Sequence, residues 1–234
     1  MSDHSTLRLA TADSDPRSTH APTFASLALD VEFTVTEVEG INWLAHRRGP
    51  ALSREIADLT ERAMRGEIPI ERIYAERLAR IRPCESEVAE LAEAYRQRMA
   101  PGAIEVLDEL RAAGVRLALI SGGIRQAILP LASSLGFTPA EVFAVRVAFD
   151  ASGAYAGFDD RSPLASSTGK ATVLQRLYYP RPLLAVGDGA TDVAMRETAD
   201  AFAAFTGFAR RVEVVRAADH EVNSFAELRS LVLQ

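Results

Sequence analysis

Polar residues that could do chemistry stand directly after short apolar runs at three separated points of this chain. Asp30, Ser121 and Asp188 each follow such a run. One such cluster is typical of a plain turn, because Asp, Ser and Gly are common turn and cap residues. Three clusters placed in the same way favour a shared site, since ligands of parallel sheets bind outside the carboxyl ends of the strands.

The residue types in these clusters suit phosphoryl transfer. Asp30 and Asp188 offer the hard oxygen ligands that Mg²⁺ prefers. Lys170 stands just before a helical pattern over 171–177 and could supply a point charge to a phosphate. A carboxylate is also a known nucleophile toward phosphorus. Together these groups favour a phosphoryl-transfer enzyme over a plain binding domain.

An anion site is predicted next to the second cluster. Ser121, Gly122 and Gly123 precede a helical pattern over 124–135. Backbone amides at a helix N-terminus make fixed donors for an anion. We therefore expect the Ser-Gly-Gly segment to hold phosphoryl oxygens.

The elements that must position these residues follow from the apolar pattern. The runs 24–29, 115–120 and 183–187 are typical of buried strands, and 201–205 and 212–215 are candidates for further strands. Helical patterns lie between them, which indicates βαβ units and a parallel sheet.

Two stretches depart from this alternation. Residues 39–99 have apolar residues at helical spacing throughout, which predicts a helical insert after the first strand. Residues 142–158 show alternation, a turn and a second short run, which predicts a hairpin. The predicted organisation is a flexible N-terminal tail over 1–22, an α/β core over 23–36 and 100–234, and a helical cap domain over 37–99.

Composition excludes several classes of function. The formal net charge of −6 argues against a nucleic-acid partner, and we expect the basic pair Arg210-Arg211 to be solvated surface. Cys84 is the one cysteine, so no intramolecular disulfide can form. The sequence shows neither a membrane-spanning run nor a signal peptide, and it predicts a cytoplasmic protein. A monomer and a homodimer both remain open.

Four motifs, in order, resemble those of the haloacid-dehalogenase superfamily, and specifically those of the phosphoserine phosphatases. The motifs are Asp30-Val-Glu32-Phe-Thr34, Ser121-Gly122-Gly, Lys170 and Gly-Asp188-Gly-Ala-Thr191-Asp192. The resemblance implies an α/β fold: a Rossmann-like parallel sheet with helices on both faces and a small helical cap after the first strand. It also implies a phosphomonoesterase of the phosphoserine phosphatase kind, which serves serine biosynthesis.

The resemblance assigns a role to each motif residue. Asp30 would attack phosphorus and form an aspartyl-phosphate, and Glu32 would act as the general acid and base. The expected cofactor is Mg²⁺, held by Asp30, the backbone carbonyl of Glu32 and Asp188. The expected phosphate-binding residues are Ser121, Gly122, Lys170 and Thr191, with Asp192 in a supporting position.

Substrate choice is assigned to the cap by the same resemblance. Glu39 in Glu-Gly-Ile, Met64 in Arg-Ala-Met-Arg-Gly and Arg77 in Arg-Leu match the family's substrate-binding positions. A carboxylate can pair with a substrate ammonium and a guanidinium with its carboxylate. O-Phosphoserine, a small phosphate ester, is the expected substrate.

Glu32 departs from the family's usual Asp at this position. One extra methylene displaces the carboxyl by roughly an ångström, and such a displacement can cost about 10²-fold in rate. A phosphoserine:homoserine phosphotransferase branch of the superfamily is similar here, because it also has Asp-x-Glu. Phosphotransfer to a second hydroxyl such as homoserine, and hydrolysis of a related ester, therefore remain alternatives.

Overall fold

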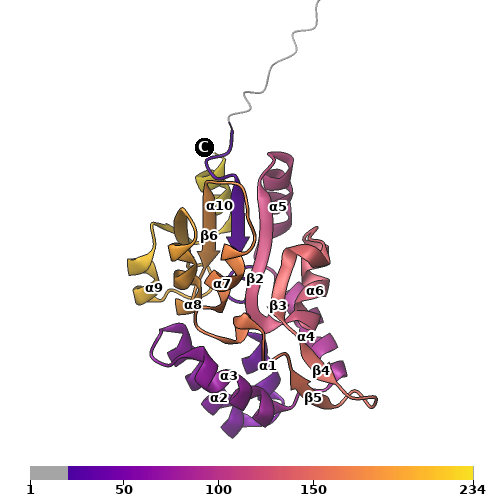
Figure 1. Cartoon of the computed structure of the whole chain (residues 1–234). Helices are drawn as coiled ribbons and strands as arrows, with labels where there is room; N and C mark the ends of the chain where they lie inside the picture. Colours follow the sequence, from indigo (N-terminus) through magenta and orange to yellow (C-terminus); the bar gives the residue numbers. More distant parts are fainter. Residues whose placement is uncertain (1–20, 234) are drawn as a thin grey trace, which may run out of the picture.

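The structure, a computed structural model, describes residues 21–233 (Figure 1). Residues 1–20 of the predicted tail lie outside the described part. The main sheet consists of β1 Ser26–Leu29, β2 Arg116–Ile124, β3 Val142–Val145, β6 Leu183–Gly187, β7 Ala201–Phe205 and β8 His220–Val222. A small antiparallel sheet consists of β4 Val147–Phe149 and β5 Tyr155–Phe158. The helices are α1 Gly40–His46, α2 Pro50–Met64, α3 Ile70–Ile81, α4 Glu85–Gln97, α5 Ala103–Ala112, α6 Arg125–Ser134, α7 Gly169–Gln175, α8 Ala190–Val193, α9 Val212–Ala217 and α10 Phe225–Val232.

The main sheet is parallel throughout, in the order β3-β2-β1-β6-β7-β8. The connections from β1 to β2 and β3 run one way across the sheet, and those from β3 through β6 to β8 run the other way. Parallel crossovers are right-handed, so the two directions place their helices on opposite faces. The predicted fold class, a Rossmann-like sheet with helices on both faces and a helical insert, is confirmed.

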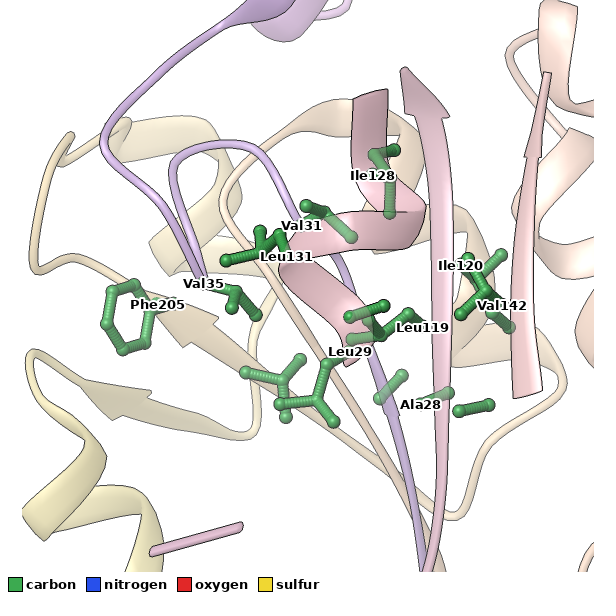
Figure 2. Packing of buried hydrophobic residues seen from close by; sticks show 14 of the residues in the cluster. Ala28, Leu29, Val31, Val35, Leu119, Ile120, Ile128, Leu131, Val142 and Phe205 are labelled. Carbon is green, nitrogen blue, oxygen red and sulfur yellow. The ribbon is translucent and has the colours of Figure 1, made fainter. Parts of the chain in front are cut away.

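The sheet strands are apolar because both of their faces are covered. Every residue of β1, β6 and β7 is buried. Figure 2 shows side chains of the central strands gathered with Ile128 and Leu131 of α6, and with Val31 and Val35 of the loop after β1. This packing holds the end of β1 rigidly against the sheet.

Helices α1–α4 form the insert between β1 and β2. Helix α3 buries Ile70, Ile73, Tyr74, Arg77, Leu78 and Ile81, a stripe at helical spacing. Helix α4 packs against α6 of the core. Helices α1–α3 lie beyond the carboxyl ends of the sheet strands, as Figure 1 shows.

Some predicted elements differ from those in the structure. The predicted strand at 212–215 is wrong, because these residues belong to α9. Strand β8 takes the sheet edge beside β7 instead, and β-branched residues favour strands only where a sheet partner is present. The predicted helix after Ser121 begins only at Arg125, because β2 continues through Ile124.

Candidate active site

The candidate site lies between β1 and β6, where the order of strand addition across the parallel sheet reverses. Strand β1 pairs with β2 on one side and with β6 on the other, so the loops after β1 and β6 diverge and leave a crevice. In Figure 1 the arrows of β1 and β6 point toward α1–α3. The Asp30 amide donates to the Val186 carbonyl at 2.9 Å, which fixes the first residue after β1 beside β6.

Three buried aspartates meet at this point. Carboxylate oxygens of Asp30, Asp188 and Asp192 all lie within 4.8 Å of one another. Lys170 Nζ lies 2.7 Å from Asp30 Oδ1, a distance that makes an ion pair although the angles do not meet those of a hydrogen bond. The same ammonium donates to Asp192 Oδ1 at 2.6 Å. Lys170 thus joins the loop after β1 to α8.

Asp192 is anchored by backbone donors. Its Oδ2 accepts from the amides of Gly189 at 2.9 Å and Asp188 at 3.2 Å, at the start of α8. Its other oxygen, Oδ1, accepts from Lys170, so both oxygens of this carboxylate have hydrogen-bond partners within the protein. It therefore shapes the loop that presents Asp188.

Burial and mutual repulsion raise the pKa values of two of the three aspartates, Asp30 and Asp188. Burial, and then the charge of Asp192, raise the pKa of Asp30 to about 7, although Lys170 opposes the shift. Burial, and then Asp30 and Asp192, raise the pKa of Asp188 well above its usual value. Burial alone would lower the pKa of Lys170, but Asp192 and Asp30 raise it above the usual value, so the lysine stays charged.

The donor set suits a divalent cation. Among residues 21–233, five carboxylates and three cationic side chains converge here: Asp30, Glu32, Glu39, Asp188 and Asp192, with Arg77, Lys170 and Arg211. When all are ionised, the cluster carries two more negative than positive charges. Close carboxylate oxygens are the ligands of hard divalent cations, which would offset this excess.

Glu32 is bound by groups from the insert. Its Oε1 accepts from the Gly40 amide at 2.8 Å and from the Tyr95 hydroxyl. Burial, and then the nearby Glu39, raise the pKa of Glu32 to about 7, and the Tyr95 hydrogen bond opposes the shift. Burial, and then Glu32, raise the pKa of Tyr95 well above its usual value, so the tyrosine stays a donor.

The insert supplies a buried charged pair above the triad. Arg77 Nη1 lies 4.0 Å from Glu39 Oε1 and donates to Thr60 Oγ1 at 2.7 Å. Arg77 Nε is buried and has no hydrogen-bond partner in the described part of the chain. A buried donor without a partner is costly, so this atom is suited to a ligand acceptor.

A narrow cavity of about 40 Å³ lies between the core side and the insert side of the site. The cavity is lined by Asp30, Glu32, Phe33, Glu39, Ile41, Met64, Ile70, Tyr74, Arg77, Gly122, Leu164, Ser166, Lys170, Asp188 and Thr191. We expect the insert to move when a phosphate ester enters this narrow space.

Most of the residues that the sequence predicted line this one cavity. Ser121 and Asp192 are buried behind it. Ser121 Oγ accepts from the Gly123 amide at 3.0 Å and so shapes the Ser-Gly-Gly loop in this state. The roles assigned to the individual residues remain predictions.

Sequence reasoning missed two neighbours of the cavity. Arg211 was expected on the surface but is buried, and it pairs with Asp188 and, at 3.0 Å, with Glu61 of α2. Arg211 follows β7 at the same sheet edge, but nothing in the local sequence separates it from the exposed Arg210. Tyr74 of α3, which the sequence analysis did not single out, lines the cavity and donates to the Gly122 carbonyl at 2.8 Å.

No helix within residues 21–233 combines the length and the apolar character needed to cross a bilayer.

Comparisons with known proteins agree with this fold and site. The model of the haloacid dehalogenase-like hydrolase family matches residues 30–197. Phosphoserine phosphatase of Homo sapiens is 36% identical over 206 residues, which cover 87% of this chain and 91% of the relative. The chloroplastic phosphoserine phosphatase of Arabidopsis thaliana is 38% identical over 208 residues, which cover 87% and 70%.

Solved structures show the same likeness. A phosphoserine phosphohydrolase-like protein from Francisella tularensis superposes with a TM-score of 0.79 at 25% identity, over 88% of this chain and 98% of that one. The fold and the carboxylate site thus define a hydrolase of the haloacid dehalogenase type. Within that class, the chain belongs to the phosphoserine phosphatase family.

Proposed function

We propose that this enzyme hydrolyses O-phosphoserine through an aspartyl-phosphate on Asp30. The observation that supports this most is the two-sided cavity. Its core side presents Asp30 beside Lys170, and its insert side presents Glu39 beside Arg77. A phosphate ester that also bears an ammonium and a carboxylate has a charged group for each side.

In the first step the Asp30 carboxylate attacks phosphorus, on the side opposite to the seryl oxygen. A new O–P bond forms to Asp30 as the bond from phosphorus to serine breaks. Glu32 gives its proton to the departing seryl oxygen. Lys170, 2.7 Å from Asp30, holds the phosphoryl oxygens near the nucleophile.

In the second step water attacks the phosphoryl group on Asp30, and Glu32 takes the proton of that water. The bond between Asp30 and phosphorus breaks, which releases phosphate and restores both carboxyl groups. Glu32 can serve in both directions because its carboxyl reaches the cavity.

Mg²⁺ fits the carboxylate cluster, with Asp30, the backbone carbonyl of Glu32 and Asp188 as its protein ligands. When bound, it supplies positive charge that offsets the negative charge of the phosphoryl oxygens. The excess of carboxylates over cationic side chains supports this assignment.

Release of phosphate from O-phosphoserine tests the proposal. We expect turnover by the purified protein, its loss after EDTA treatment, and its recovery with added Mg²⁺. Asp30→Asn should lower turnover by a factor on the order of 10⁴ or more, because it removes the nucleophile. Turnover that survives EDTA, or a fully active Asp30→Asn variant, would contradict it.

Phosphotransfer is a second candidate, and Glu32 is the observation that favours it. Its displaced carboxyl could activate water poorly, so that an alcohol such as homoserine accepts the phosphoryl group instead. Adding homoserine to the same assay distinguishes hydrolysis from phosphotransfer. Hydrolysis predicts unchanged phosphate release, whereas transfer predicts phosphohomoserine at the expense of phosphate.

A further inference from the structure

The backbone of Glu32 belongs to the core, but its carboxyl group is hydrogen-bonded to residues of the insert. Glu32 follows β1, but both hydrogen bonds to its side chain come from the insert. The Gly40 amide at the start of α1 donates to Oε1 at 2.8 Å, and the hydroxyl of Tyr95 in α4 donates to the same oxygen. Tyr95 is fully buried.

Two residues without side chains make room for this longer carboxylate. A Cβ at Gly123 would lie 2.9 Å from Glu32 Oε1 and 3.0 Å from its Cδ. A Cβ at Gly40 would lie 2.8 Å from Oε1 and would collide with the Tyr95 hydroxyl. The site is therefore shaped for a carboxyl group with the reach of glutamate, bound on one oxygen.

Both donors use Oε1, and no hydrogen bond reaches Oε2 within residues 21–233. Glu32 also lines the cavity. One oxygen is thus held by the insert while the other stays available to the reactants. This is the arrangement that a proton-transfer group needs, since misplacement by about 1 Å can cost about 10²-fold in rate.

We propose that Tyr95 is a positioning residue that fixes Glu32 for proton transfer, and that it allows glutamate to work in this position. The inference rests on the proposed function. Tyr95 keeps its own proton throughout. The proton moves from Glu32 Oε2 to the seryl oxygen as the P–O bond breaks, and from water to Oε2 as the Asp30–phosphorus bond breaks.

The role belongs to the hydroxyl and not to the ring. Phenylalanine would fill the same buried space, so Tyr95→Phe removes only the hydrogen bond to Glu32. An aspartate at position 32 is one methylene shorter and would not reach that hydroxyl. The effect of Tyr95→Phe should therefore depend on which residue occupies position 32.

A double-mutant cycle on phosphoserine turnover tests the proposal. Tyr95→Phe should lower kcat at least about tenfold and change KM less than about twofold, because it disturbs the transition state alone. In a Glu32→Asp background the same change should have no further effect. Tyr179→Phe is the matched control, because the one hydrogen bond of its hydroxyl within residues 21–233 is to the Leu117 carbonyl, at 3.4 Å, near the opposite end of β2.

A second measurement uses p-nitrophenyl phosphate, whose leaving group needs no proton. Tyr95→Phe should release a stoichiometric burst of p-nitrophenolate and then turn over slowly, because only the attack of water still needs Glu32. A burst would not follow from a general loss of packing.

Each other outcome overturns the inference. An unchanged kcat in Tyr95→Phe, or an equal loss in the native and the Glu32→Asp backgrounds, would show that the hydroxyl does not act through Glu32. A Tyr95→Phe protein that does not fold would show that the hydroxyl serves stability. Failure of the unmodified protein to release phosphate would instead overturn the proposed function itself.

Discussion

At the scale of the residue, Arg77 is the group with the clearest unmet bonding capacity. Its side chain is buried, one nitrogen is bound to Thr60, and Nε has no partner among the described residues. Glu39 lies 4.0 Å away, too far for a close ion pair. A substrate carboxylate that reaches Nε would complete the hydrogen bonding of this guanidinium.

Replacement of Arg77 should therefore affect substrates unequally. Arg77→Ala should raise the KM for phosphoserine about 10- to 100-fold, as expected for the loss of a charge-assisted hydrogen bond of roughly 1.5–3 kcal/mol. The KM for p-nitrophenyl phosphate, which has no carboxylate, should change little. Steady-state kinetics on both substrates measure this.

Arg80→Ala is the control, because Arg80 lies on the same helix but is exposed and pairs with Glu55 on the surface. It should leave both KM values unchanged. Equal increases for the two substrates in Arg77→Ala would remove the case for an amino-acid phosphate.

At the scale of the element, the loop before α9 joins the core to the insert. Arg211 pairs with Asp188 after β6 and, at 3.0 Å, with Glu61 of α2. Asp188 and Arg211 are both buried, whereas Glu61 is partly exposed. Removal of the guanidinium would leave a buried carboxylate without its cationic partner.

Arg211→Met should thus lower the free energy of unfolding of the metal-free protein by about 3 kcal/mol. For a chain of this size that is roughly 6–12 °C in melting temperature. Saturating Mg²⁺ should reduce the loss, because a cation beside Asp188 replaces the missing charge. Thermal unfolding with EDTA and with Mg²⁺ measures both effects.

The adjacent Arg210→Met provides the comparison. Arg210 pairs with Glu221 on the surface, and exposed pairs contribute only about 0–1 kcal/mol. A loss in Arg211→Met as small as that in Arg210→Met, or one that Mg²⁺ leaves unchanged, would contradict this account of the loop.

The pattern of apolar residues predicted the insert and four strands of the sheet, β1, β2, β6 and β7, but it assigned β3 to the hairpin and did not predict β8. The run 183–187 lies between charged and turn residues and coincides with β6. The run 212–215 contains three valines, more β-branched residues than the run 183–187, but it forms α9, because β8 occupies the edge of the sheet. Which strand takes an edge depends on contacts between distant segments, and local propensity does not encode them.

The same limit applies to the site. Asp30 and Asp188 could be predicted to lie together, because the carboxyl ends of parallel strands lie at the same edge of the sheet. In the structure their carboxylate oxygens lie within 4.8 Å of each other. The positions of Arg211 and Tyr95 at the site could not be predicted, because they depend on how the loop before α9 and helix α4 pack against the core. Nothing in the local sequence separates buried Arg211 from exposed Arg210.

At the scale of the whole molecule, the insert closes the cavity over the sheet. The space of about 40 Å³ is too small for a phosphate ester. Met64 and Gly66, at the end of α2, meet the start of α8, where a Cβ at Gly66 would lie 3.4 Å from the Cβ of Ala190. We therefore expect these two segments to separate and close again during turnover.

A disulfide between them should block turnover. Cβ atoms about 3.5–4.5 Å apart suit a disulfide, so Gly66→Cys with Ala190→Cys, in a Cys84→Ser background, should cross-link on oxidation. Gly66 has a φ of 78°, so cysteine there costs about 1–2 kcal/mol, which the fold can tolerate. Oxidation should abolish phosphoserine turnover, and dithiothreitol should restore it.

The reduced double variant and each single variant after oxidation are the controls for this experiment. A cross-linked protein that turned over phosphoserine as fast as its reduced form would show that substrate enters without opening of the insert.

The proposed hydrolysis depends on transfer of the phosphoryl group to the carboxylate of Asp30. The most direct measurement is acid quenching during turnover of phosphoserine, followed by borohydride reduction, which converts an acyl phosphate to an alcohol, and by mass spectrometry of the peptides. We expect homoserine at position 30 and no reduced side chain at any other aspartate or glutamate. Continued turnover with an unmodified Asp30, or with the modification at another carboxylate, would contradict it.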